Sequence, residues 1–178
     1  MLSIARLWSA SVLALALLAG TAAASGTKIA GTYSLDHAKS SSIASAVDSC
    51  VSQMNAFKRP IARHLLLKDN IPSEKLSILA KEDGLEFSQG TDPPATCSND
   101  GVESNWADHD GEVFRLACQM DGSVWRLVFT GVEGQSRNEY RPSDDGTEIK
   151  LDVTVRSPHL PVPLNYLLVY RRASSTVK

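Results

Sequence analysis

The chain has 178 residues, 43% of them hydrophobic, and its 18 lysines and arginines nearly balance 20 aspartates and glutamates. This length fits one domain with a sizeable core, since single domains commonly hold about 100–150 residues. Because the charge is balanced and the basic residues are scattered, we expect no nucleic-acid binding.

The first 24 residues have the order of a secretory signal peptide. Arg6 supplies the positive charge, Leu7 to Gly20 is almost wholly apolar, and Thr21 to Ala24 are small residues suited to cleavage. The apolar run is shorter than the roughly 20 residues that a membrane span needs. We therefore expect an exported protein, periplasmic or secreted, with no membrane span after signal removal. Residues 25–172 then form a single domain and 173–178 a flexible tail.

The mature chain opens with a pattern of strand, helix and helix. Residues 28–35 alternate apolar and polar side chains, which predicts a strand. A helical period over about 40–57 predicts an amphipathic helix, whose stripe comprises Ile43, Ala46, Val47, Cys50, Val51, Met54 and Phe57. Pro60 suits the first turn of a second helix over about 60–69, with Ile61 and Leu65 on its inner side.

The rest of the chain predicts short strands separated by regular turns. The clearest is a hairpin over 112–133, turning at Asp121-Gly122, whose arms place Phe114, Leu116, Cys118 and Met120 on one face with Trp125, Leu127, Phe129 and Gly131. The other strands cover 75–81, 85–89, 102–107, 135–141, 147–156 and 165–172. Residues 90–99 are expected to be irregular because of Pro93 and Pro94.

These elements predict a mainly β fold. Turns at this spacing indicate an antiparallel meander, and closing it into a barrel of about eight to ten strands removes the exposed sheet edges. The helix pair, inserted after the first strand, would pack across one end or side of the barrel.

The sequence carries no recognisable catalytic or cofactor motif. It has no Gly-x-Ser-x-Gly elbow, no glycine-rich phosphate loop, and four histidines that stand far apart, so we expect no cofactor and no metal. Asp108-His109-Asp110 is a weak metal candidate that turn chemistry explains better. Cys97 and Cys118 either form a disulfide or stay free, and Cys50 lies on the helical stripe as a small buried hydrophobe.

The order of elements resembles the calycin superfamily, which includes the lipocalins and the fatty-acid-binding proteins. Gly31-Thr32-Tyr33 is similar to the lipocalin Gly-x-Trp element, and Arg171 or Arg172 would take the place of the basic residue that packs across that ring. The helix pair after the first strand is closer to the fatty-acid-binding proteins. The opening from Gly31 to Ser40 also resembles exported bacterial lipocalin-like proteins of unknown function.

The resemblance implies a barrel that binds a small apolar or amphipathic molecule, such as a lipid or fatty acid, without catalysis. The last strand departs from the family, because Val169-Tyr170-Arg171 replaces the Arg-x-Tyr that grips a fatty-acid carboxylate. Two alternatives stay open: an envelope-accessory or protein-interaction scaffold with a filled barrel, and a hydrolase. The candidate ligand-binding residues are Met54, Phe57, Phe114, Leu116, Trp125, Leu127, Phe129 and Tyr166.

Overall fold

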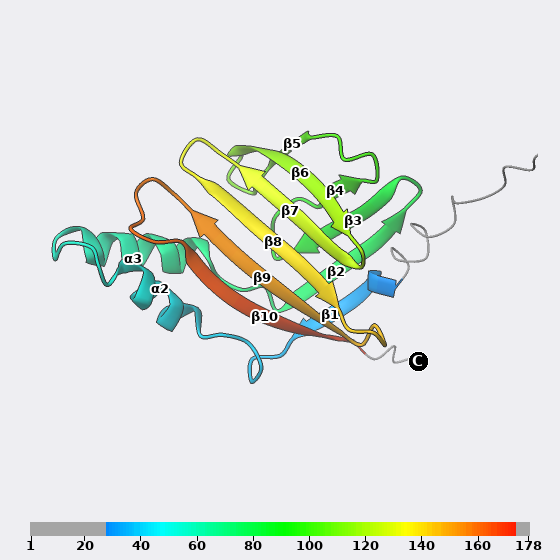
Figure 1. Cartoon of the computed structure of the whole chain (residues 1–178), viewed down its shortest axis with the longest axis horizontal. Helices are drawn as coiled ribbons and strands as arrows, with labels where there is room; N and C mark the ends of the chain where they lie inside the picture. The colour runs from blue at the N-terminus through cyan, green and yellow to red at the C-terminus, as the bar shows by residue number, and fades with distance from the viewer. Residues whose placement is uncertain (1–27, 174–178) are drawn as a thin grey trace, which may run out of the picture.

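The computed structural model describes residues 28–173 as ten strands and two helices (Figure 1). The chain begins with β1 (Gly31–Leu35), α2 (Ile43–Val51) and α3 (Lys58–Asp69). The strands that follow are β2 (Lys75–Lys81), β3 (Gly84–Gln89), β4 (Ala95–Ser98), β5 (Ser104–Ala107), β6 (Val113–Asp121), β7 (Val124–Thr130), β8 (Gln135–Pro142), β9 (Glu148–Arg156) and β10 (Leu164–Arg172).

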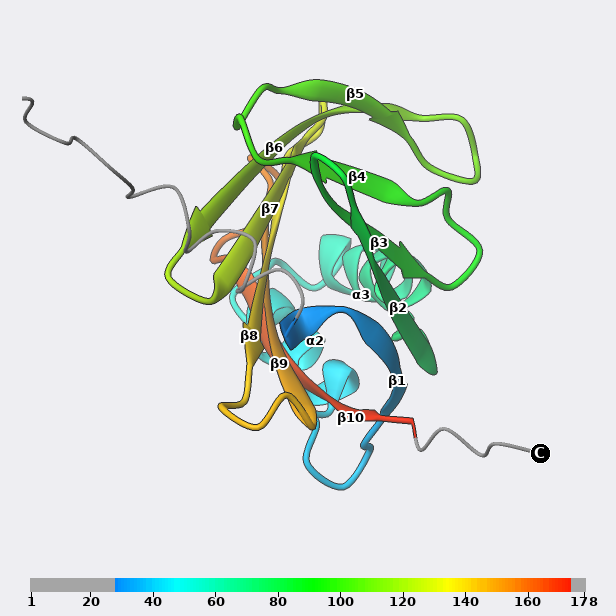
Figure 2. The same ribbon diagram turned by 90° about the vertical axis from the view of Figure 1, so that its right-hand side faces the viewer.

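All ten strands form one antiparallel sheet that curls into a nearly closed barrel. Its order is β4-β3-β2-β1-β10-β9-β8-β7-β6-β5, so β10 returns to pair with β1 and the two ends of the sheet are β4 and β5. Figure 2 looks roughly along the barrel, with α2 and α3 across its far end. The predicted fold class and the place of the helix pair are confirmed.

Several boundaries differ from the sequence prediction. The stretch 90–99 contains a four-residue strand, β4, which begins directly after Pro94 and pairs on one side only, with β3. The first helix ends at Val51 rather than Phe57, and the central hairpin turns at Gly122-Ser123 because Asp121 still pairs with Val124.

The register shows which side chains point into the barrel. Tyr166, Leu168 and Tyr170 of β10 pair with Val153, Leu151 and Ile149 of β9, and all six belong to or pack against the main core. The last strand is apolar on both faces because the residues between them are covered as well. The segment after β1 runs alongside, where Asp36 N–H donates to Val169 O and Ser41 N–H donates to Leu167 O.

A second, smaller core joins the helices to the barrel. Val47, Cys50 and Val51 of α2 are buried with Leu164 of β10. The inner side of α3 is formed by Ala62, Leu66 and Leu67. The second helix forms where it was predicted, but its predicted inner side was wrong, because Ile61 and Leu65 are 65% and 50% exposed.

Charged side chains lie on the outer face of the sheet. The buried carboxylate of Glu139 on β8 pairs with Arg126 at 2.8 Å, with Arg137 at 3.5 Å and with Arg141, which also reaches Asp152. These arginines hold the pKa of Glu139 below its usual value, with the hydrogen bond from Arg126 as the largest cause. Arg126 and Arg137 therefore face outward, as the alternation predicts.

The predicted signal peptide lies outside the described residues, and the predicted tail does so except for Ala173. Within residues 28–173, no helix is long and apolar enough to cross a bilayer.

Candidate functional site

The end of the barrel far from the helices is sealed by an arginine and a tyrosine. Arg172 of β10 lies over the ring of Tyr33 on β1, with its guanidinium carbon 4.8 Å from the ring centroid. It donates hydrogen bonds to Tyr33 Oη at 2.6 Å and to the carbonyls of Gly146, Ala30 and Lys28. From the sequence, either Arg171 or Arg172 could be the basic residue that packs across the Tyr33 ring. The structure assigns it to Arg172, since Arg171 points outward to Asp36.

Gly31 leaves the room that this arginine occupies. A Cβ on Gly31 would lie 2.3 Å from Nη1 of Arg172. The Gly-x-Tyr pattern and the terminal arginine therefore form one unit that closes the floor of the barrel.

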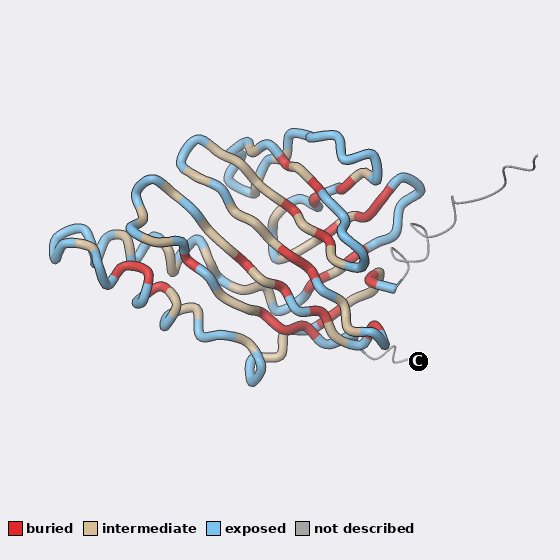
Figure 3. Tube along the Cα trace, viewed as in Figure 1, coloured by how far each residue is buried: buried red, intermediate tan, exposed pale blue. Residues whose placement is uncertain are grey.

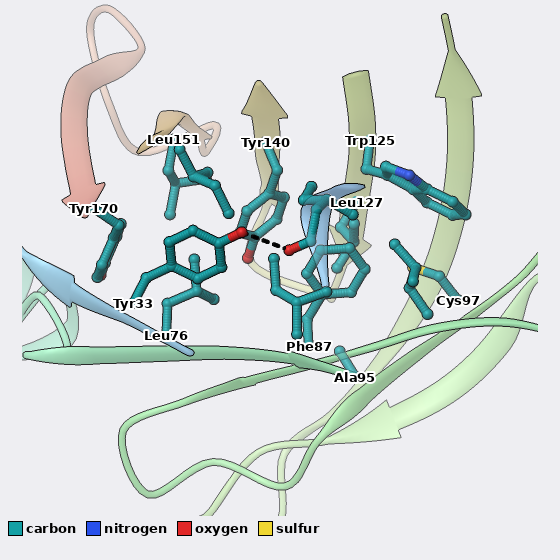
Figure 4. Close-up of a cluster of buried hydrophobic side chains, with 14 of the residues drawn as sticks. Tyr33, Leu76, Phe87, Ala95, Cys97, Trp125, Leu127, Tyr140, Leu151 and Tyr170 are labelled. Carbon is teal, nitrogen blue, oxygen red and sulfur yellow. Dashed lines mark hydrogen bonds between the residues drawn. The ribbon is translucent and has the colours of Figure 1, made fainter. Parts of the chain in front are cut away.

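Between this end and the helices, side chains from opposite strands meet across the interior of the barrel. Phe87 of β3 and Tyr140 of β8 come from strands on opposite sides of the barrel, yet their ring centroids are 4.7 Å apart (Figure 4). Gln89 Nε2 donates to Tyr140 Oη at 2.9 Å, and Trp125 packs 6.2 Å from Phe87. Burial raises the pKa of Tyr140, so its hydroxyl stays neutral. The half of the barrel away from the helices is thus a packed core.

The half near the helices is different. Here the residues at inward positions are only half buried, whereas most inward residues toward the middle of the same strands are fully buried. Figure 3 shows how burial changes along the strands. These half-buried residues lie at the end of the barrel next to the helices. We call this region the mouth. Its residues are Gln89, Trp106, Phe114, Phe129, Ser136, Asn138, Val155 and Tyr166.

Aromatic and aliphatic side chains line most of the mouth. Trp106 lies edge-on to Phe129 at 4.9 Å and 5.8 Å from Phe114. Gly131 leaves no free space inside, because the Phe114 ring occupies it: a Cβ on Gly131 would lie 2.8 Å from that ring. Val155 and Tyr166 pack against both cores. Tyr166 Oη donates to Asn70 at the end of α3, which ties the helix pair to the mouth.

Three cross-links span the gap between β4 and β5, the two ends of the sheet, and we call this gap the seam; the first cross-link runs from β4 across to β6. Cys97 and Cys118 form a disulfide with an S–S distance of 2.04 Å. At the mouth, Trp106 Nε1 donates to Pro93 O at 3.0 Å, and His109 Nδ1 lies 2.6 Å from Asp92 Oδ1. The hydrogen bond with Asp92, followed by the nearby Asp110 charge, raises the pKa of His109.

Two surface hollows occur at the ends of the strands. One, of about 280 Å³, lies at the rim of the mouth beside Phe114, Gly131 and Val132. The other, of about 470 Å³, lies at the opposite end between the β4–β5 turn and the β6–β7 hairpin. Trp125 lines the second hollow, and its indole N–H has no hydrogen-bond partner among residues 28–173.

The sequence-predicted ligand residues separate into four groups. Phe114, Phe129 and Tyr166 lie at the mouth, whereas Leu116, Trp125 and Leu127 belong to the packed core. Met54 packs in the helix core. Phe57 is 89% exposed just before α3, so the prediction that it contacts the interior was wrong. The helical period did not reveal that α2 stops at Val51.

Sequence reasoning missed five mouth residues: Gln89, Trp106, Ser136, Asn138 and Val155. Each occupies an inward position by alternation, which was the available signal. The pattern does not show which inward residues stay accessible to solvent once the barrel has closed. In the sequence alone, Gln89 and Ser136 look like ordinary surface residues.

The titratable side chains of residues 28–173 are used mainly in surface pairs. Three of the four histidines lie at the exposed surface in pairs with carboxylates, His37 with Glu74, His109 with Asp92 and His159 with Glu133. No group of three or more metal-ligating side chains occurs within the described part of the chain. The free thiol of Cys50 is buried against Val162, and desolvation raises its pKa, which disfavours a nucleophilic thiolate.

The comparisons with known proteins agree with this architecture. No protein-family model and no curated protein matches the sequence. Among solved structures, lipid binding protein 8 of Caenorhabditis elegans matches with a TM-score of 0.55 and 10% identity, over 83% of this chain and 96% of the other. Fatty-acid-binding protein 1 of Echinococcus granulosus matches at 0.53 and 12%, over 83% and 99%.

A secretory abundant heat soluble protein from Ramazzottius varieornatus matches at 0.56 and 9%, over 82% and 96%. At such identities the likeness concerns the fold alone. The shared fold is a calycin-like antiparallel barrel, here of ten strands with two helices after β1.

Proposed function

We propose that this protein reversibly binds one small apolar or amphipathic molecule in the mouth of its barrel and performs no chemistry on it. The observation that carries the proposal is the change in burial along the strands. Inward side chains are packed around Phe87 and Tyr140, but those near the helices stay half exposed, and five of these eight are aromatic or aliphatic. Covering them with a ligand would remove apolar surface from water.

The structural neighbours support the ligand class. The names of two of them, lipid binding protein 8 and fatty-acid-binding protein 1, describe lipid binding. The ligand would sit above the cross-barrel bridge rather than along the whole axis, because Gln89, Phe87 and Tyr140 join the two walls.

We further propose export to the periplasm or the cell exterior, directed by residues 1–24. The disulfide supports this part of the proposal, since disulfides persist mainly in oxidising compartments.

The first test is a native mass spectrum of the mature protein purified from its exported compartment without detergent. The proposal expects a non-covalent adduct of lipid or metabolite mass that disappears on denaturation. A bare polypeptide mass under several growth conditions, together with no uptake of the neutral dye Nile red, would contradict it.

A matched pair of variants locates the site. Ser136→Phe fills the mouth from β8, whereas Gln135→Phe places the same ring one residue earlier on the outer face. We expect Nile red binding to fall at least about tenfold in the first variant only, which is about 1.4 kcal/mol of affinity. Circular dichroism establishes that both variants fold. Equal binding by the two would move the site away from the mouth.

A scaffold role is the alternative, and one observation favours it. Phe57, Ile61 and Leu65 recur every four residues and are all exposed beside the helix pair. A bare mass combined with a defined partner in pull-down, lost on Ile61→Ser with Leu65→Ser, would support this role instead.

A further inference from the structure

The interior of the barrel is almost without charge. The inward positions of the ten strands follow from the register, and among them the structure places no aspartate, glutamate, lysine or histidine within residues 28–173. Arg172 is the one inward cation in this range. The charged side chains of β8, including Glu139 and its arginines, all lie outside.

Arg172 is not available to a ligand in the mouth. Its guanidinium already donates four hydrogen bonds, to Tyr33 Oη and to the carbonyls of Gly146, Ala30 and Lys28. It lies at the floor, next to the fully buried Tyr33, with the Phe87–Tyr140 bridge between it and the mouth. A carboxylate above the bridge would therefore have no inward-facing cation of the described strands beside it, and His109 at the edge of the mouth is already paired with Asp92.

The polar groups that do face the mouth are neutral. Ser136 Oγ donates to Asn138 Oδ1 at 3.3 Å, and the Asn138 amide nitrogen also interacts with Tyr140, which leaves one of its two N–H donors for a ligand. Gln89 uses its amide nitrogen on Tyr140 and keeps its carbonyl oxygen. Together these side chains offer both donors and acceptors. Such a set suits a hydroxyl, an amide or an ester, each of which needs hydrogen bonds but no counter-ion.

We propose that the ligand is an uncharged amphipathic lipid, with an apolar body against Trp106, Phe129 and Val155 and a hydroxyl or carbonyl head near Asn138. This inference rests on the proposed function and narrows it. A free fatty acid would have to bring an ionised carboxylate into a site without a cation, where the loss of hydration is not repaid. It would bind only after taking up a proton.

The test compares two ligands with the same chain. Binding of 1-dodecanol and of dodecanoate to the delipidated mature protein is measured at pH 8 by displacement of Nile red. We expect the alcohol to bind at least about tenfold more tightly, and the affinity for dodecanoate to rise as the pH falls toward about 5, where its carboxyl becomes protonated. The affinity for dodecanol should not change over this range.

Two variants assign the head group. Asn138→Leu should weaken dodecanol at least about tenfold, whereas Thr154→Leu, on the outer face of β9, should leave it unchanged. If dodecanoate binds at pH 8 as tightly as the alcohol, the neutral-ligand inference is wrong while the proposed function stands. If neither ligand nor Nile red binds, the proposed function itself fails, and the inference with it.

Discussion

Removing Arg172 should open the floor of the barrel and lower the free energy of unfolding by about 2–4 kcal/mol. The two half-buried hydrogen bonds, to Tyr33 Oη and Gly146 O, contribute about 1–1.5 kcal/mol each, since the donor is charged. The contact with the Tyr33 ring adds about 0.5–1 kcal/mol. The remaining two bonds, to Lys28 O and Ala30 O, are exposed and add little.

Arg171→Ala is the matched control for Arg172→Ala. Its side chain is the next along the strand, points outward and pairs with Asp36, and a surface pair of this kind is worth about 0–1 kcal/mol. Urea unfolding followed by tryptophan fluorescence gives both values, and with a slope of about 2 kcal/mol/M the Arg172→Ala midpoint should fall by about 1–2 M.

A second variant tests whether the Tyr33 hydroxyl and the Arg172 guanidinium act together. In a double-mutant cycle with Tyr33→Phe, the two changes should couple, because the hydroxyl lost by the second variant accepts a hydrogen bond from the first residue. If Arg172→Ala lies within about 0.5 kcal/mol of Arg171→Ala, the floor is not held by this contact and the reasoning is refuted.

The other predictions concern the seam and the outer face. Replacing Cys97 and Cys118 together by Ser should cost about 3 kcal/mol in urea unfolding, because the bridge closes a loop with a sequence separation of 21; an unchanged midpoint would contradict this. The raised pKa of His109 means that its pairing stabilises the seam at low pH and that this contribution is lost as the pH rises through the folded pKa. An NMR titration should give a midpoint above about 6.5 that falls in Asp92→Asn, and an unshifted midpoint would count against the pairing. Glu139→Gln should cost about 1–2 kcal/mol at pH 7, since its arginine neighbours lose their counter-charge. Because its folded pKa is lowered, the difference from the parent should vanish as the pH falls below about 4, and a constant difference would contradict the assignment.

Much of the fold could be predicted from local pattern. The strand over 75–81 has the predicted limits, and both arms of the central hairpin expose the predicted faces, because alternation and turn residues act over a few positions. The prediction failed where tertiary contacts decide. β4 forms in spite of two preceding prolines because it pairs only with β3. In α3 the run Leu65-Leu66-Leu67 is compatible with two inner faces, and only packing against α2 selects one.

The site was harder to predict than the fold, because alternation shows which side of the sheet a residue faces but not how far along the barrel it lies. All inward positions look equivalent along a strand, but closure brings Phe87 of β3 against Tyr140 of β8 and turns part of the interior into core. Trp125 and Leu127 lie in that filled part, although they point the same way as Phe129 at the mouth. The size of any ligand is therefore set by a contact between two strands that are distant in the sheet order, which no local pattern contains. The charged residues among the inward positions of the described strands, by contrast, can be counted once those positions are known, and Arg172 is the one found. The chemistry of the proposed ligand's head group is therefore easier to infer from this sequence than the length of the ligand.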